Sequence, residues 1–284
     1  MHEGCGRSTP PGVNYRHVHH AGNFADLVKH AALLHLLAEV TARPEPLLVI
    51  DTHAGAGLYP LADSRTGEAE AGVVRLMAEP SPPLPFAPLI AAVRRLNGDG
   101  SLLRYPGSPL LIAEALRPGD RLIACELRPD DGAALTRSLS PLGRRAECLQ
   151  ADGYLALRNR LPPDATNALL LIDPPYERGD EYAQAVRAIG AALDRAPRAV
   201  VCLWAPVKDL ETFDALVRDL ERIAPGLLVA ECRLRPLTDP LRLNGCALAL
   251  INAPATCEPV LAEIMAWTAA RLGQRGGAGR VWRP

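Results

Sequence analysis

Residues 169–176 read Leu-Leu-Leu-Ile-Asp-Pro-Pro-Tyr, and this stretch indicates both the fold and the place of a site. Four apolar residues in a row are typical of a buried parallel strand, and two prolines prevent its continuation. The strand therefore ends at Asp173, with Tyr176 close behind it. Open α/β sheets bind ligands at the carboxyl ends of their strands. We therefore expect Asp173, the Pro174 carbonyl and the Tyr176 ring to face a ligand.

These groups suit one kind of chemistry. A carboxylate beside a proline carbonyl can accept hydrogen bonds from an exocyclic amine, and an aromatic ring can stack on the base that carries the amine. Methyltransferases that act on the amino groups of adenine or guanine carry a similar Asp-Pro-Pro-Tyr motif. A Pro-rich turn without function is the alternative, so the interpretation needs support from the rest of the chain.

Apolar runs alternate with helical patterns along most of the chain. The expected strands are 47–50, 121–125, 146–149, 168–172, 199–203, 227–232 and 246–251. The expected helices are 24–40, 109–116, 129–139, 182–192, 209–223 and 259–271. This alternation predicts an α/β fold with a doubly wound, mostly parallel sheet of seven strands. Residues 273–279 are Gly-rich and are expected to form a flexible approach to residues 280–284.

One connection is too long for a simple crossover. Asp51 and Arg121 are 70 positions apart, whereas a parallel crossover needs about a dozen residues. The excess includes Glu-Pro-Ser-Pro-Pro-Leu-Pro at 79–85, which breaks helices and strands. We expect a helical insertion over 59–103, a main domain made of 14–58 and 104–284, and a disordered extension over 1–13.

Acidic residues follow four of the expected strands. Asp51 precedes Thr-His-Ala-Gly-Ala-Gly at 52–57, whose glycines let a ligand approach the backbone. Glu126 suits the two hydroxyls of a ribose, and Asp152 could accept from an adenine amine. With Asp173, these acids are expected to line one edge of the sheet and to form a site for a nucleotide-like cofactor.

Polar residues elsewhere support this site. Asn23 and Asp26 are expected to cap the helix that follows, and Ser108 is expected to cap the helix that begins at Pro109. Lys29 and His30 fit contacts to the cofactor, although a solvated helix face is the alternative for both. The histidines near the N-terminus lack acidic or cysteine partners at zinc-like spacing, so no metal site is predicted.

Composition excludes several classes of protein. The 284 residues carry 31 basic and 32 acidic side chains, so a nucleic acid would have to bind local patches rather than a uniformly basic surface. Candidate phosphate contacts are Arg16, Arg65, Arg75, Arg94, Arg95 and Arg104. Seven scattered cysteines fit a reducing cytoplasm, and no apolar stretch reaches the length of a membrane span. Nothing in the sequence demands more than a monomer.

Taken together, these stretches resemble the bacterial 23S ribosomal RNA adenine-N6 methyltransferases of the RlmJ type, which modify adenine 2030. The resemblance runs from Asn14 to the C-terminus. The distinctive matches are Tyr-Arg-His (15–17), His-Ala-Gly-Asn (20–23), Leu-Val-Lys-His (27–30), Asp-Thr-His-Ala-Gly-Ala-Gly (51–57), Tyr-Pro-Gly-Ser-Pro (105–109) and Ile-Asp-Pro-Pro-Tyr-Glu (172–177).

The resemblance implies a Rossmann-like class I methyltransferase fold, S-adenosyl-L-methionine as cofactor and 23S rRNA as partner. It implies that Asp173, Pro174 and Tyr176 serve catalysis and that Tyr15 touches the RNA. The positions that it assigns to the cofactor are Lys29, His30, His53, Ser108, Glu126, Asp152, Gly153 and Asp173.

Three other functions are compatible with the same core. A DNA adenine-N6 methyltransferase usually has a separate target-recognition domain, and an insertion of this size is small for that task. A protein glutamine methyltransferase typically has Asn where this chain has Asp173. A non-catalytic RNA-binding protein would not need the intact acids and Asp-Pro-Pro-Tyr.

Overall fold

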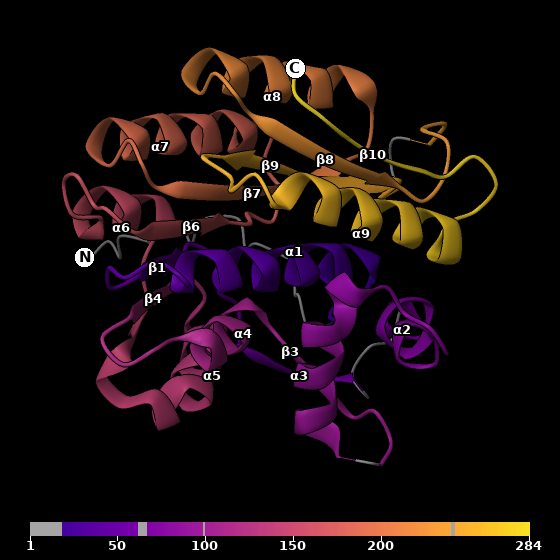
Figure 1. The fold of residues 1–284 in the computed structure, drawn as a ribbon, viewed down its shortest axis with the longest axis horizontal. Coiled ribbons are helices and arrows are strands. Elements are labelled where there is room, and N and C mark those ends of the chain that lie inside the picture. The colour runs from indigo at the N-terminus through magenta and orange to yellow at the C-terminus, as the bar shows by residue number, and fades with distance from the viewer. Residues whose placement is uncertain (1–18, 62–66, 99, 240–241) are drawn as a thin grey trace, which may run out of the picture.

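A central sheet of eight strands organises the molecule (Figure 1). The computed structural model describes residues 19–61, 67–98, 100–239 and 242–284. The strand order across the sheet is β10-β8-β9-β7-β6-β1-β4-β5, and a separate pair, β2-β3, lies outside it. The doubly wound α/β prediction is confirmed.

Five strands form the parallel part of the sheet. They are β1 (Leu48–Asp51), β4 (Arg121–Cys125), β5 (Ala146–Leu149), β6 (Ala168–Ile172) and β7 (Val200–Val207). Every residue of β6 is buried, as expected for a strand with helices on both faces. Because these strands run in the same direction, all of their carboxyl ends lie at one edge of the sheet, called the carboxyl edge below.

The prediction of seven strands was wrong by one. The antiparallel part contains β8 (Leu228–Arg233), β9 (Gly245–Ile251) and also β10 (Ala278–Trp282), which pairs with β8. Residues 278–279 therefore belong to a strand and not to a flexible approach. Gly279 is required there because a Cβ atom would lie 2.3 Å from the Met265 carbonyl carbon of the neighbouring helix. A Gly-rich sequence predicts flexibility, whereas here the missing side chain permits close packing.

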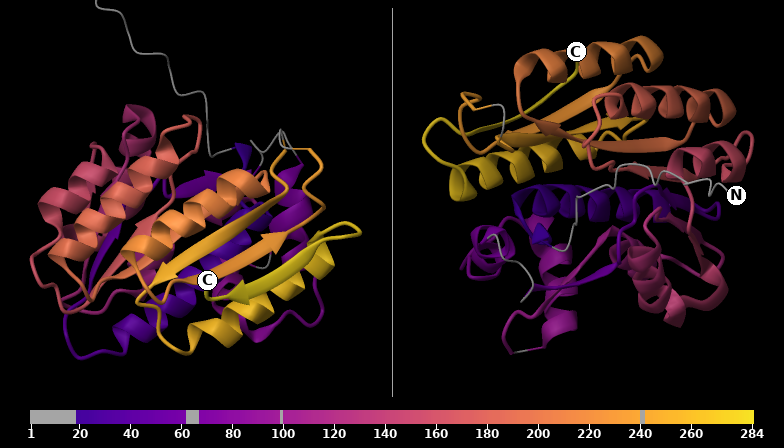
Figure 2. Two further views of the ribbon diagram at one scale, coloured as in Figure 1. Left: turned by 90° about the horizontal axis from the view of Figure 1, so that it is seen from above. Right: turned by 180° about the vertical axis from the view of Figure 1, so that it is seen from behind.

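Helices cover both faces of the sheet, as the views in Figure 1 and Figure 2 show. One face carries α6 (Gly153–Arg160), α7 (Glu181–Arg195) and α8 (Leu210–Ile223). The other face carries α1 (Phe24–Thr41), α4 (Ser108–Ala115), α5 (Pro129–Leu139) and α9 (Cys257–Leu272). Helix α6 was not anticipated from the sequence, and a short helix η5 (Ser140–Arg145) follows α5.

The segment between β1 and α4 packs beside α1. It contains β2 (Leu58–Pro60), η3 (Glu70–Val74), α2 (Arg75–Met77), η4 (Leu84–Phe86), α3 (Ala87–Asn97) and β3 (Arg104–Pro106). Strands β2 and β3 pair with each other, and η3, η4 and α3 contact α1. Whether 59–103 behaves as a separate subdomain stays a prediction.

Helix α1 begins at the carboxyl edge and packs along one face of the sheet toward the opposite edge, where the Val40 carbonyl accepts from Asn167. Its N-cap is Asn23, whose side chain accepts from the Asp26 backbone N–H, as predicted. The Asp26 carboxylate accepts in turn from the Gly22 N–H. This cap fixes the first turn of α1, and Lys29, in the second turn, reaches the carboxyl edge.

Candidate active site

The four predicted acids lie along the carboxyl edge. Asp51 ends β1, and Glu126, Asp152 and Asp173 follow β4, β5 and β6. These strands are consecutive in the sheet, in the order β6-β1-β4-β5. In the register, Asp51 is level with Leu171, so Asp173 extends two residues beyond it. The topology therefore brings together side chains that are up to 122 positions apart in sequence.

An ion pair fixes the orientation of Asp173. The Lys29 Nζ lies 2.5 Å from Asp173 Oδ2 and 2.9 Å from Asp26 Oδ1, and Lys29 is 5% exposed. Burial alone would lower the pKa of Lys29, but the charges of Asp173 and Asp26 outweigh it and raise that pKa well above its usual value. Lys29 is therefore a cation that binds one oxygen of Asp173.

Asp51 is the most deeply buried acid of the site. It is 0% exposed and accepts a hydrogen bond of 2.7 Å from the Ser108 hydroxyl. Burial raises the pKa of Asp51 to about 7, although the Ser108 bond opposes the shift. The predicted capping role of Ser108 was wrong: Gly107 is the N-cap of α4, and Ser108 begins the helix with its hydroxyl directed to Asp51.

The Gly-rich turn after β1 adopts backbone conformations that favour glycine. Gly55 has φ +61° and Gly57 has φ +81°. The Gly55 N–H donates to one Glu126 oxygen at 3.0 Å, and the Arg128 N–H donates to the other at 2.8 Å. Glu126 is thus held at the turn by backbone donors, with carboxylate acceptor capacity left for a ligand.

Asp152 and Gly153 hold the turn after β5 close to the turn after β1. Asp152 is the N-cap of α6 and accepts from the Tyr154 and Leu155 N–H groups. This structural role is separate from its predicted contact to adenine, which stays a prediction. A Cβ atom on Gly153 would lie 2.1 Å from the Thr52 carbonyl oxygen. Only glycine lets these two turns approach so closely.

His53 and Tyr154 pack together between these turns. Their ring centroids are 5.2 Å apart in an edge-to-face arrangement, and Thr52 Oγ1 lies 2.7 Å from His53 Nδ1. Burial lowers the pKa of His53 to about 4, so the ring is neutral near pH 7. The Tyr154 hydroxyl is buried and finds no hydrogen-bond partner among the described residues. Sequence reasoning missed Tyr154, although its place beside Asp152 and Gly153 was a usable signal.

Tyr176 is held rigidly behind Asp173. Its hydroxyl donates to the Trp204 carbonyl at 2.8 Å, and its ring packs against Tyr182 at 4.5 Å between centroids. Its φ of +51° is unusual for a bulky residue and often occurs at functional sites. Because Tyr176 is only 7% exposed, a base could stack on it only after covering groups move.

His30 lies deeper than a surface contact would require. It is 1% exposed, its Nδ1 lies 2.8 Å from the Tyr105 hydroxyl, and the two rings stack. Its predicted contact to the cofactor stays a prediction. Tyr105 belongs to β3, and its contact with His30 joins the segment after the insertion to α1. The sequence analysis named Tyr105 only as part of a motif.

Comparison with known proteins identifies the family. A sequence model of the family described as "Ribosomal RNA large subunit methyltransferase D, RlmJ" matches residues 44–284. The chain belongs to this family. It is 34% identical over 270 residues to ribosomal RNA large subunit methyltransferase J of Escherichia coli (strain K12), covering 93% of this chain and 95% of that protein. The Haemophilus influenzae protein of the same name is 32% identical, with the same coverage.

A solved structure agrees with this assignment. The crystal structure of protein LPL1258 from Legionella pneumophila matches with a TM-score of 0.87 at 31% identity, over 93% of this chain and 98% of that chain. The class I methyltransferase fold is thus confirmed for this RlmJ-family enzyme, with the eighth strand as the difference from the expectation.

Other predicted residues of the RlmJ-family chain lie away from the acids or outside the described residues. Tyr15, Arg16 and Arg65 fall outside the described residues. Arg75 donates to the Arg271 carbonyl, and Arg95 pairs with Glu114. Among the described residues, no group of three or more His, Cys, Asp and Glu side chains is arranged to hold a metal ion. None of the described helices is long and apolar enough to cross a membrane.

Proposed function

We propose that this chain transfers a methyl group from S-adenosyl-L-methionine to the N6 amine of an adenine in 23S rRNA, adenine 2030 by family resemblance. The observation that carries the proposal is the placement of Asp173, followed by Pro174-Pro175-Tyr176, beside three further acids on neighbouring parallel strands. Membership of an rRNA methyltransferase family favours rRNA over DNA or a protein glutamine as substrate.

The residues at the carboxyl edge fit the proposed cofactor. The turn at Gly55 and Gly57 offers backbone without side chains, and Glu126 offers acceptors for two ribose hydroxyls. Asp152 and Gly153 flank the place expected for the adenine ring, and the neutral His53 adds a polar ring nearby. When bound, the cofactor supplies an electrophilic methyl group attached to sulfur. The further predicted contacts are Lys29, His30, Ser108 and Asp173.

Asp173 is the proposed acceptor for the target amine. Lys29 binds Asp173 Oδ2, so the carboxylate cannot turn freely and Oδ1 is available to accept from the amine. The Pro174 carbonyl accepts the second amine hydrogen, and these two bonds orient the nitrogen lone pair. Catalysis then rests mainly on positioning and electrostatics. After transfer the nitrogen is cationic and acidic, so the Asp173 carboxylate can take its proton.

Tyr176 is the proposed stacking platform. Its hydroxyl bond to Trp204 and its packing against Tyr182 prevent the ring from rotating. A base that leaves its stack to reach Asp173 would gain about 1–3 kcal/mol from stacking on an aromatic ring. The small exposed fraction of Tyr176 implies that RNA binding includes a movement that uncovers this ring.

The test is methyl transfer by the wild type and by Asp173→Ala. With labelled cofactor and unmodified 23S rRNA, the wild type should produce N6-methyladenosine, and Asp173→Ala should lose at least 1,000-fold in turnover (about 4 kcal/mol). Cofactor affinity, measured by calorimetry, should be weakened but measurable. Asp194→Asn, an exposed acid on α7, is the control and should behave as wild type. Near-normal turnover of Asp173→Ala, or label only in DNA or protein, would refute the proposal.

A further inference from the structure

We propose that two loops at the far end of the carboxyl edge bind the phosphate backbone of the substrate RNA. The loops are residues 233–239 and 242–244, from the last residue of β8 to the start of β9, and residues 271–277, from the last turn of α9 to the start of β10; together they are called the basic loops. The inference rests on the proposed function, because it takes rRNA as the substrate. It uses arginines other than those that the sequence alone suggested as phosphate contacts.

The basic loops concentrate positive charge. They carry Arg233, Arg235, Arg242, Arg271 and Arg275 against a single acid, Asp239, in a chain whose formal net charge is −1. The rest of the chain is therefore distinctly acidic. The basic loops therefore attract a polyanion more strongly than the remainder of the chain does on average, which favours this part of the molecule for RNA binding.

The topology places the basic loops at the same edge as Asp173. Strand β8 is antiparallel to β9, which is antiparallel to β7, so β8 ends at the carboxyl edge. Strand β10 begins at Ala278, opposite Arg233, which brings 271–277 to this edge as well. Strands β7 and β9 separate β6 from β8. In the register, Val229 is level with Ile172, so Arg233 projects four residues beyond it and the end of β8 is about 20 Å from the end of β6. A few nucleotides can bridge that distance.

The two loops form one packed unit. The Gln274 N–H donates to the Leu234 carbonyl at 2.7 Å, and the side chain of Asn244, 0% exposed, donates to the Lys208 and Asp239 carbonyls. A Cβ on Gly276 would lie 2.9 Å from Pro236. The arginines are thus presented on a rigid surface, which reduces the entropy lost when RNA binds.

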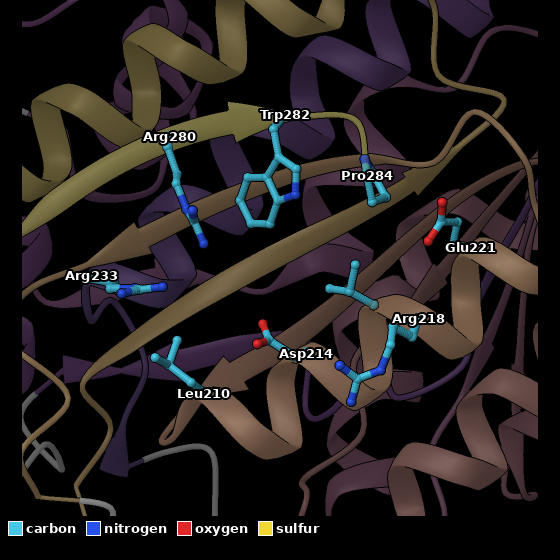
Figure 3. Close-up of a pocket in the computed structure, with 9 residues that line it drawn as sticks. Leu210, Asp214, Arg218, Glu221, Arg233, Arg280, Trp282 and Pro284 are labelled. Carbon is cyan, nitrogen blue, oxygen red and sulfur yellow. The ribbon is translucent and has the colours of Figure 1, made fainter.

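A buried acid orients two of the cations. Glu231 is 1% exposed, and its carboxylate accepts from the Nε of Arg233 and from the Nε of Arg280. Arg280 also lies over the Trp282 ring, 4.1 Å from its centroid. Figure 3 shows Arg233 and Arg280 beside the hollow bordered by α8, with Trp282 next to them. Nε bonds leave the terminal guanidinium N–H groups to donate to phosphate oxygens.

Arg235 provides a second, independent indication of a ligand. Its Nε is buried and has no hydrogen-bond partner among the described residues. Arg235 itself is half-buried. A buried N–H donor without an acceptor is costly, and a phosphate oxygen would satisfy the Nε once the side chain turns toward solvent. Arg275 is exposed on the adjoining loop, whereas Arg242 and Arg271 already pair with Asp239 and Glu79. Arg235 and Arg275 are therefore the cations most available to RNA.

The experiment compares Arg235→Gln/Arg275→Gln with wild type. For two phosphate contacts, the slope of log affinity against log salt should fall by about 1.4, and rRNA affinity at 0.15 M salt should fall about tenfold. The kcat at saturating rRNA and the cofactor Kd should stay within twofold, because neither arginine lies beside Asp173. Arg275→Gln alone, at an exposed position that cannot disturb folding, should weaken rRNA binding about fourfold.

The matched control is Arg43→Gln/Arg198→Gln, which removes the same charge at the opposite edge of the sheet. Arg43 follows α1, and Arg198 precedes β7. Equal rRNA affinities and salt slopes for the two double variants would overturn the inference, as would a loss in kcat without a loss in affinity. If the wild type binds rRNA but methylates another substrate, the proposed function fails, while the binding comparison still decides the inference.

Discussion

Replacing Asp51 by Asn should change how the stability of the protein depends on pH. An aspartate has a pKa of about 3.9 in an unfolded chain, whereas burial raises the pKa of Asp51 to about 7 in the folded protein. Folding therefore favours the protonated carboxyl. The stability that this proton contributes is fully present below about pH 4 and is lost as the pH rises through about 7.

The size of the effect follows from the same shift. One pKa unit corresponds to about 1.4 kcal/mol, so the burial of ionised Asp51 costs about 4 kcal/mol above pH 7. Asn has nearly the same shape, stays neutral at every pH and can accept the Ser108 hydrogen bond through its Oδ1. Relative to wild type, Asp51→Asn should gain about 3 kcal/mol of unfolding free energy between pH 5 and pH 8.

The assay is urea unfolding of both proteins, without cofactor, at pH 5 and pH 8. Other titrating groups, such as His20 and Glu68, occur in both proteins and cancel in the difference. Asp194→Asn, at an exposed position, should show no pH-dependent difference from wild type. A stability difference between Asp51→Asn and wild type that is the same at both pH values would refute the reasoning about Asp51.

Two further predictions concern the packing around the site. Lys29→Met should lower the unfolding free energy by about 3 kcal/mol and the melting temperature by about 5 °C, because Asp26 and Asp173 lose the cation between them. Adding Asp26→Asn should recover part of this loss. An unchanged melting temperature would contradict the role of the ion pair. Gly153→Ala should lower the unfolding free energy, measured with urea, by about 1–3 kcal/mol, because its Cβ would overlap the Thr52 carbonyl. Gly179→Ala, with open space around it, should lower it little. Equal losses for the two variants would rule out the close approach of the two turns.

The ion pair between Lys29 and Asp173 links the folding of α1 to the proposed chemistry. The Asn23 cap fixes the first turn of α1, and Lys29 extends from the next turn to Asp173, just after β6. The same region meets the insertion, since the Asn23 and His20 side chains both bond to Glu68. A movement of the insertion at Glu68 would therefore also shift the start of α1, and with it the Lys29 ammonium that binds Asp173.

Local sequence determined the strands, most of the helices and the order of the acids. Runs such as 168–172 are apolar throughout because both of their faces are covered, and that pattern needs no knowledge of partners. Likewise, prolines at 174–175 end a strand in any context. Since parallel strands end at one edge, the chain positions of Asp51, Glu126, Asp152 and Asp173 were enough to predict that they would meet.

Only the tertiary structure decided the eighth strand, the partner of Ser108, the cation beside Asp173 and the position of the basic loops. Each of these depends on which segments lie side by side: β10 forms because β8 offers an unpaired edge, and Ser108 meets Asp51 because α4 packs at the end of β1. Such contacts join residues far apart in the chain, and their free energy comes from burial and pairing that local sequence does not specify.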